Sequence, residues 1–172
     1  NNPTFSSKLH SLNPGIYVNN LKLGNNNIQN EYVKEMHIKE LGSNSISFIT
    51  ADGAIDNDDT PDMTEINSAN LLAHEISLAM KLQKNGGCFI IKVFGMRYSI
   101  THQLIAVLCH CYKHVQIVKP FTSRAVNDER YVVCQQFDTE KMIDFHLEED
   151  GNLTNIVSVN KEWVKELESI AT

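Results

Sequence analysis

Residues 88–94, C-F-I-I-K-V-F, constrain the fold of this chain more than any other segment. Every position except Lys92 is apolar, so both faces of the predicted strand are hydrophobic. Strands that are buried on both faces occur almost only in parallel sheets, because crossover connections place helices on both sides of such sheets. The segment therefore predicts a central strand of an α/β domain, with one lysine inside an otherwise apolar element.

Helix and strand patterns alternate along the rest of the chain. The predicted helices span residues 28–41, 62–84 and 100–112, followed by a terminal helix over 163–170. The predicted strands span residues 16–23, 46–50, 114–118 and 130–137. Gly42 and the triplet Asn85-Gly86-Gly87 are predicted to end the first two helices. This alternation predicts a mostly parallel sheet with helices on both faces.

Composition limits the class of protein. A chain of 172 residues with 42% hydrophobic and 21% charged residues suits one soluble globular domain. No apolar run approaches the ~20 residues of a transmembrane helix, and no signal-peptide pattern opens the chain. The expected location is intracellular: cytoplasmic, nuclear or associated with a virus.

The charge and the cysteines narrow the expected partners and environment. A formal net charge of -6 argues against broad electrostatic capture of nucleic acid, so RNA contact would need a local basic patch or a partner. The four cysteines lie in apolar strand or helix patterns: Cys88, Cys109, Cys111 and Cys134. They are predicted to be buried thiols in a reducing compartment.

Three charged residues flank predicted strands. Asp52 follows the strand 46–50, Lys92 lies within the strand 88–94, and Glu129 directly precedes the strand 130–137. Ligands of open α/β sheets bind beside the carboxyl ends of the strands, which makes Asp52 and Lys92 candidates for a site. A structural interpretation remains open for each residue. In it, Asp52 caps a loop, Lys92 extends from an edge strand, and Glu129 pairs with Arg130 or Arg124.

These segments resemble the RrmJ/FtsJ-like family of RNA ribose 2'-O-methyltransferases, and most of all its cap-1 branch. The resemblance covers residues 52–137, and three members of the family's Lys-Asp-Lys-Glu tetrad correspond to Asp52, Lys92 and Glu129. It implies a Rossmann-like fold that uses S-adenosylmethionine, with residues 132–134 in an antiparallel edge strand. It also divides the chain into a methyltransferase domain over 1–138 and a tail over 139–172.

The resemblance implies a role for each tetrad residue. Lys92 would orient and help deprotonate a ribose 2'-hydroxyl, while Asp52 and Glu129 hold its ammonium group. Burial disfavours the charged form of a lysine and adjacent carboxylates favour it, so such a site balances the two forms. Placing the hydroxyl at reactive distance from the methyl group would supply much of the acceleration.

The amino-terminal part departs from the family pattern. Asn-Asn-Pro-Thr-Phe stands where a Gly-Pro-Gly-Gly-Phe loop would finish, and the family's first lysine and first strand have no counterpart. The residues expected to contact the cofactor are Asn19, Asn20, Asp52 and Gly53, with Gln29 and Asn30 in the same region. A partner polypeptide that supplies or covers the missing strand is a further expectation.

The loop 119–128 is the expected RNA contact. The resemblance assigns it to RNA through Ser123, Arg124 and Asn127, and arginine offers planar donors suited to phosphate. The alternative is that Arg124 only closes the loop by pairing with Asp128 or Glu129.

Two sequence patterns suggest a metal site, but neither has the geometry or the residues that such a site needs. Cys109 and Cys111 point about 200° apart on a helix, so they do not share one zinc ion with His114. The acidic run Asp56, Asp58 and Asp59 lacks the glycine and glutamate of a calcium-binding loop. No metal site is therefore predicted.

Three hypotheses of function follow. The first is 2'-O-methylation of the first transcribed nucleotide of capped mRNA, possible for a viral or a cellular protein. The second is a catalytically inactive methyltransferase-like domain that serves as a binding or assembly module. The third is methylation of ribosomal RNA by an enzyme of the same family.

Overall fold

The computed structural model describes residues 27–54, 64–123, 128–148, 151–154 and 161–171. The helices of this part are α2 (Glu31–Leu41), α3 (Thr64–Leu82), α4 (Ser99–Cys111), the 3-10 helix η2 (Thr139–Lys141) and α5 (Lys161–Ala171). The strands are β1 (Ile46–Ala51), β2 (Gln83–Phe94), β3 (Tyr112–Val118) and β4 (Glu129–Phe137). Helices and strands alternate as predicted, and the α/β class is confirmed. The predicted strand over 16–23 lies outside the described residues.

The four strands form one mixed sheet in the order β1-β2-β4-β3. β1 and β2 pair in parallel, whereas β4 is antiparallel to both of its neighbours, so β3 runs in the same direction as β1 and β2. The prediction that the antiparallel strand lies at an edge is wrong, because β4 is an inner strand. Its apolar side chains Val132 and Cys134 are fully buried between those of β2 and β3.

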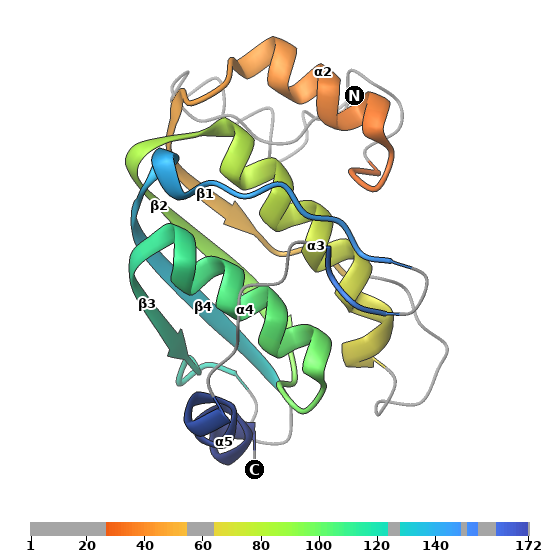
Figure 1. Ribbon diagram of the computed structural model, residues 1–172, viewed down its shortest axis with the longest axis vertical. Helices are drawn as coiled ribbons and strands as arrows, with labels where there is room; N and C mark the ends of the chain where they lie inside the picture. Colours follow the sequence, from red (N-terminus) through yellow and green to blue (C-terminus); the bar gives the residue numbers. More distant parts are fainter. Residues whose placement is uncertain (1–26, 55–63, 124–127, 149–150, 155–160, 172) are drawn as a thin grey trace.

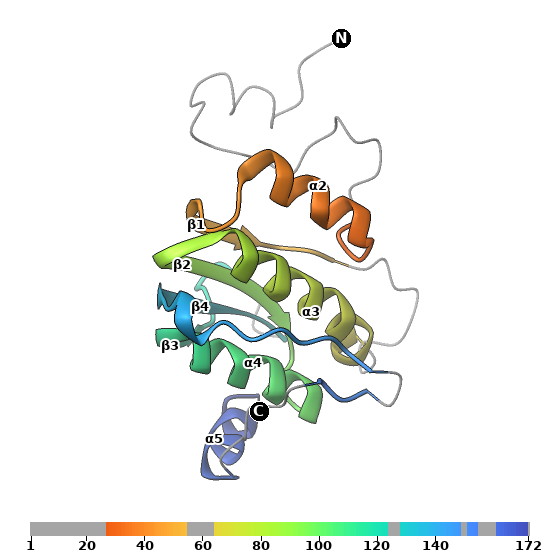
Figure 2. The same ribbon diagram turned by 45° about the horizontal axis from the view of Figure 1, so that its top comes forward.

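Helices α3 and α4 lie side by side over one face of the sheet (Figures 1 and 2), called here the covered face. In β2 the side chains of Phe89, Ile91 and Val93 point to this face and are at most 4% exposed. Those of Ile90, Lys92 and Phe94 alternate to the opposite face, called here the open face, and are only partly buried. The prediction that β2 is covered on both faces therefore holds for the covered face alone within the described residues.

The core joins α3, α4 and the covered face. Burying apolar area of this kind is the main favourable contribution to folding. Among its members, Phe89, Ile91, Met96, Leu104 and Phe137 are almost fully enclosed. The segment after residue 138 contributes to the same core through Phe145, Leu153 and Leu167.

The junction between α3 and β2 differs from the prediction. The helix ends at Leu82 and the strand begins at Gln83, so the triplet Asn85-Gly86-Gly87 lies inside the strand rather than ending the helix. Ile46 pairs with Gln83 and the next regular pair is Phe48 with Cys88, which makes this stretch an irregular bulge. The buried Gln83 amide stabilises it by donating to the Cys88 carbonyl and accepting from the Tyr112 hydroxyl.

Local sequence signals explain the ends of α2. The Asn30 side chain accepts a hydrogen bond from the Tyr32 amide at 2.9 Å, as an N-cap does. Asn30 therefore caps the first turn of α2. Gly42, with a φ of 81°, ends the helix as predicted, and its amide donates to the Ile38 carbonyl.

The cysteines are all free thiols, and their burial differs. Cys111 and Cys134 are buried and Cys88 is partly buried, but Cys109 is exposed because it lies on the side of α4 that faces away from the sheet. The prediction of buried thiols is therefore wrong for Cys109. Among the described helices, none combines the length and the hydropathy that crossing a membrane requires.

Candidate active site

The carboxyl end of the sheet gathers the predicted tetrad residues. β1, β2 and β3 end at this end of the sheet and β4 begins there, as the pairing directions require. Asp52 follows β1 directly, Lys92 lies near the end of β2, and Glu129 is the first residue of β4. Three residues that are far apart in sequence thus share one end of one sheet.

Asp52 and Lys92 are in direct contact. The Lys92 ammonium group forms an ion pair with the Asp52 carboxylate. Ala51 pairs with Ile91, so Asp52 and Lys92 are the next positions along two adjacent parallel strands. The Lys92 side chain is only 11% exposed, whereas that of Asp52 is 68% exposed, so the pair has one buried member and one accessible member.

The Lys92 ammonium group also lies over an aromatic ring. Its Nζ atom is 5.0 Å from the centroid of the Phe94 ring, within the range of a cation–π interaction. The ring and the Asp52 carboxylate both contact the Lys92 ammonium group. Lys92 is in an inner strand, so the interpretation that it extends from an edge strand is wrong.

Glu129 lies on the same face as Lys92, one step further along the sheet. Phe94 pairs with Glu129, and Lys92 pairs with Tyr131. Directly opposite residues of an antiparallel pair share a face, so all four side chains belong to the open face. The Tyr131 hydroxyl donates a hydrogen bond to the Glu129 carboxylate at 2.9 Å, and this bond, with some burial, raises the pKa of Tyr131 to about 12.

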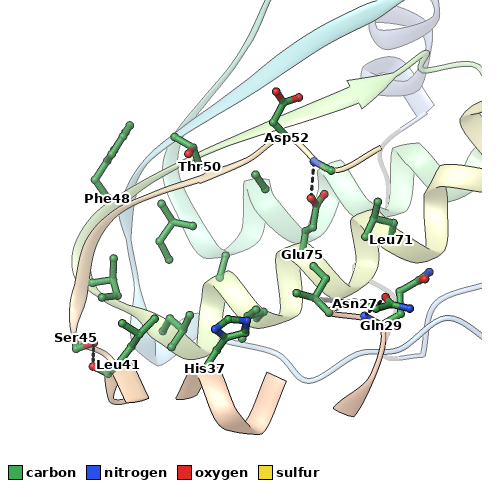
Figure 3. Close-up of a pocket in the computed structure, with 18 of the residues that line it drawn as sticks. Asn27, Gln29, His37, Leu41, Ser45, Phe48, Thr50, Asp52, Leu71 and Glu75 are labelled. Atoms are coloured by element: carbon green, nitrogen blue, oxygen red, sulfur yellow. Dashed lines mark hydrogen bonds between the residues drawn. The ribbon is translucent and has the colours of Figure 1, made fainter. Parts of the chain in front are cut away.

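Glu75 is a functional candidate that the sequence reasoning missed. It projects from α3 toward the end of β1 and is 7% exposed, and its Oε1 atom accepts a hydrogen bond from the Gly53 amide at 3.0 Å (Figure 3). Burial raises the pKa of Glu75 to about 7, against the opposing effects of the Gly53 amide and Lys92. The sequence signal that could have revealed Glu75 is its position among Leu72, Ile76 and Ala79, on the buried side of α3.

The close approach of Glu75 to the turn requires a glycine at position 53. A β-carbon at position 53 would overlap the Glu75 carboxylate and lie 2.9 Å from Leu71 Cδ2. A larger residue would therefore displace either the turn that follows Asp52 or the α3 side chains beneath it. The predicted site residue Gly53 thus lies where the backbone turns away from β1, and Glu75 holds that turn.

Glu65 is a second carboxylate that the sequence reasoning missed. It is 6% exposed, and it accepts hydrogen bonds from the Arg97 and Tyr98 amides at 3.0 Å and from the Thr101 hydroxyl at 2.6 Å. These donors are at the start of α4, where a negative charge is favoured. Glu65 therefore fixes the loop that leads out of β2 shortly after Lys92. Its position in the first turn of α3 gave no sign of this distant contact.

A groove of about 1070 Å³ runs along β1 and is bounded by α2 and α3 (Figure 3). Asp52, Thr50 and Phe48 point to the side of β1 that faces away from α3, and Glu75 and Leu71 approach from α3. The groove is mainly apolar, with carboxylates at the end that carries Asp52.

The predicted RNA-contact loop is described in part. Ser123 donates its amide to the Pro120 carbonyl at 3.0 Å, and its hydroxyl is buried with no hydrogen-bond partner among the described residues. Asp128 accepts from the Arg97 guanidinium at 2.9 Å. Outside the described residues lie Arg124, Asn127, Asn19, Asn20 and the acidic run with Asp56, Asp58 and Asp59. In the described part, no three His, Cys, Asp or Glu side chains gather as metal ligands would.

The comparison with protein families decides the family. A family model described as FtsJ-like methyltransferase matches residues 8–137. The chain belongs to the FtsJ-like methyltransferase family. Members of this family use S-adenosylmethionine in general. The resemblance drawn from the strand-end residues is confirmed, and so is the Rossmann-like fold class.

The curated relatives of this FtsJ-like chain are named cap-specific mRNA (nucleoside-2'-O-)-methyltransferase 1. The protein from Trypanosoma brucei brucei is 35% identical over 54% of this chain and 25% of its own length. The human protein is 36% identical over 52% of this chain and 11% of its own length, and the Drosophila melanogaster protein is 31% identical over 62% and 13%. The chain thus matches a quarter or less of these relatives.

The comparison with solved structures gives one partial match to report. A crystal structure described as a ribosomal RNA methyltransferase from Plasmodium falciparum is 25% identical to this chain, with a TM-score of 0.49. The match covers 67% of this chain and 59% of that chain.

Proposed function

We propose that this FtsJ-like chain takes part in S-adenosylmethionine-dependent 2'-O-methylation of RNA ribose, most specifically at the first transcribed nucleotide of capped mRNA. The observation that carries the proposal is the Asp52–Lys92 ion pair at the carboxyl end of the sheet. A buried lysine held by a carboxylate at this end of an α/β sheet is placed to meet a ligand. The names of the relatives support the capped substrate.

Lys92 orients the acceptor. Its ammonium group has three donor hydrogens, of which the Asp52 carboxylate engages one side, while the Phe94 ring lies on another. A remaining donor direction is available for a ribose 2'-oxygen, and the low exposure of the side chain limits the positions that Lys92 can adopt. Orientation of this kind can contribute several kcal/mol to the lowering of a reaction barrier, on the order of 7 or more in model systems.

Asp52, Glu129 and Tyr131 surround the acceptor position. Asp52 holds the Lys92 ammonium group in an ion pair, and Glu129 with the Tyr131 hydroxyl forms a second polar pair beside it on the open face. When the 2'-hydroxyl loses its proton, the Asp52 and Glu129 carboxylates are the groups of this site that can accept it. The chain thereby supplies orientation and proton transfer from side chains of β2, of β4 and of the turn after β1.

The groove beside β1 suits the cofactor in charge and in shape. S-adenosylmethionine supplies a methyl group on a positively charged sulfonium, and it also carries an ammonium group. The Asp52 carboxylate places negative charge at one end of the groove, where Gly53 adds no side chain. Asp52 and Gly53 are therefore the residues proposed to hold it, and Asn19 and Asn20 remain proposed contacts.

A further strand is proposed to pair with β1. Only one edge of β1 is paired within the described residues, and that partner is β2. Phe48 of β1 is 57% exposed, and the groove between α2 and α3 follows the other edge. An unpaired edge offers backbone donors and acceptors to another strand. A polypeptide segment in the same protein or in a partner would complete the cofactor groove by adding this strand.

The test is methyl transfer from labelled S-adenosylmethionine to capped RNA, followed by nuclease digestion and mass spectrometry to locate the methyl group. We expect a 2'-O-methyl group on the first transcribed nucleotide, with the full-length gene product as the enzyme. Uncapped RNA and ribosomal RNA serve as controls for substrate class. A folded protein that transfers no methyl group to any RNA would refute the proposal and favour the inactive binding module.

A further inference from the structure

Helix α3 carries two buried carboxylates outside the Asp52–Lys92 ion pair. Glu65 is 6% exposed and Glu75 is 7% exposed, and they lie ten residues apart, which is about 15 Å along a helix. A buried carboxylate is unfavourable unless it is hydrogen-bonded. The donors come from two loops: Glu75 is bonded to the turn after Asp52, and Glu65 to the loop that leaves β2 after Lys92.

Each carboxylate lies directly against a glycine of its loop. A β-carbon at Gly53 would overlap the Glu75 carboxylate (Figure 3), and a β-carbon at Gly95 would lie 2.5 Å from Glu65 Oε2. Gly95 also has a φ of +79°, which other residues rarely adopt. Both loops therefore approach α3 with their backbone, where a side chain would not fit.

The loop held by Glu65 also reaches the third tetrad residue. Both oxygens of Glu65 accept from the Arg97 amide at 3.0 Å. The Arg97 guanidinium in turn pairs with Asp128 at 2.9 Å, and the Gly95 amide donates to the Asp128 carbonyl at 3.2 Å. Asp128 directly precedes Glu129, so the bonds from α3 continue to the start of β4.

The ion pair of the candidate site needs this support. Asp52 is 68% exposed, and ion pairs with so exposed a member contribute little energy. Residues that orient a reacting group must be held to within about 0.5 Å. Gly53 is next to Asp52, and Gly95 begins the loop that leaves β2, so bonds to these loops limit where the site residues can lie.

We propose that Glu65 and Glu75 are positioning residues: from α3 they hold the loops after β1 and β2, so that the three tetrad residues keep the arrangement in which methyl transfer occurs. This inference rests on the proposed function, because that function supplies the reaction. Neither carboxylate takes part in the chemistry itself. Their effect is through geometry, and a misplacement of about 1 Å can lower a rate by about 100-fold.

The first test is the kinetics of methyl transfer to capped RNA by the full-length gene product. Glu65→Ala and Glu75→Ala are each expected to lower kcat by about tenfold or more, with the KM for capped RNA changed by less than about twofold. Ile76→Val is the matched control, because Ile76 is adjacent to Glu75 on α3 and lies in the core. It should lower thermal stability and leave kcat unchanged.

Conservative variants separate positioning from general stability. Glu75→Gln should keep kcat within about twofold of the parent value, because the amide oxygen still accepts from the Gly53 amide. Glu65→Gln should restore kcat only in part, because its NH2 group would face the Arg97 amide, which now donates to both oxygens. If an alanine variant does not fold, Glu65→Asp and Glu75→Asp carry the test, since each keeps a carboxylate but withdraws it from the loop by one carbon.

The second test is the position of the backbone amide signals in NMR spectra. The Asp52 signal should shift in Glu75→Ala, the Lys92 and Glu129 signals should shift in Glu65→Ala, and all three should stay near their parent positions in Ile76→Val. Unshifted signals in the alanine variants would overturn the inference. A loss of kcat that Ile76→Val reproduces, or that Glu75→Gln does not restore, would also overturn it.

The outcome is separable from that of the proposed function. Methylation of capped RNA at equal rates by the parent protein and by both alanine variants would refute only the positioning role. A parent protein that methylates no RNA, with amide signals that shift as expected in the variants, would refute only the proposed function.

Discussion

The two faces of the sheet differ in what their side chains do. On the covered face, Phe89 and Ile91 are fully buried under α3 and α4 and make no polar contacts. On the open face, Lys92 is held by an ion pair and by an aromatic ring, and Tyr131 donates to Glu129. Adjacent residues of one strand therefore belong either to the core or to the candidate site, because successive side chains of a strand point to opposite faces.

The core and the candidate site are separated even between neighbouring residues. Ile91 and Lys92 are neighbours in sequence, yet Ile91 contacts the core cluster and Lys92 contacts Asp52. Glu75 is the exception, because it reaches from α3 on the covered side to the turn that carries Asp52. The substitutions that follow test where the separation holds and where Glu75 breaks it.

The largest effect on stability is expected from Phe89→Ala. Removing this fully buried ring leaves a cavity, and we expect a loss of about 3–5 kcal/mol in the free energy of unfolding. Ile90→Ala, at the next position but on the open face, is the control and should cost less, because Ile90 is only partly buried. Chemical denaturation of both variants measures this. Equal losses would mean that the two faces are covered to the same extent.

Glu75→Gln is expected to remove a pH dependence of stability. The pKa of Glu75 is about 7 in the folded protein, above its ordinary value of 4.5, so the folded state binds the proton more tightly between these values. The free energy of unfolding should therefore fall as the pH rises from about 4.5 to 7, by about 3 kcal/mol at most. Glutamine still accepts from the Gly53 amide but does not titrate.

Denaturation of the parent chain and Glu75→Gln at several pH values checks this prediction. The difference between their stabilities should change through that pH range and become constant above it. A parallel NMR titration should show the Gly53 amide signal shifting with an apparent pKa near that of Glu75. A difference that does not change with pH would show that Glu75 does not titrate there.

Gly53→Ala is expected to have a smaller effect. The added β-carbon would overlap the Glu75 carboxylate, and relief of such overlap costs about 1–3 kcal/mol in a packed site. Thermal unfolding measures the loss, and Gly86→Ala separates crowding from glycine's backbone freedom, because a β-carbon at Gly86 would meet no atom within 4 Å but its φ is +77°. If combining Gly53→Ala with Glu75→Ala costs no less than the sum of the single changes, steric overlap with Glu75 is not the cause.

Asn30→Ala should have the smallest effect. The cap at the start of α2 is worth about 1 kcal/mol, and its loss should fray only that helix. Hydrogen exchange should accelerate in the first turn of α2 and stay unchanged in β2. Asn30→Ser is the control, since serine also caps. Faster exchange in β2 would show that α2 supports the sheet directly.

Much of the fold could be predicted from sequence, because its signals are local. Apolar spacing located α3 and α4, Gly42 ended α2, and the apolar run of β2 placed it inside the sheet. Strand order is not local: the place of β4 between β2 and β3 depends on pairing between distant segments. The bulge after Gln83 was missed because glycine is equally suited to ending a helix and to a bulge.

The site was predicted only as far as strand ends reveal it. Asp52 and Lys92 follow from the rule that parallel strands end together, and they are in contact. Glu65 and Glu75 were missed, because each lies on a helix and acts on a backbone amide more than twenty residues away. The partnership of Tyr131 with Glu129 depends on side-chain direction within β4, which a strand pattern alone does not rank above other contacts.

The most direct test of the account measures stability and methyl transfer together for Lys92→Ala. The account predicts that the rate of methyl transfer to capped RNA by the full-length protein falls by at least about 100-fold, because Lys92 orients the acceptor hydroxyl. It also predicts that the free energy of unfolding changes by about 1 kcal/mol or less, because the Asp52 carboxylate that loses its partner is 68% exposed and stays solvated. Unchanged methyl transfer, or a loss of activity that only follows a loss of folded protein, would contradict the account.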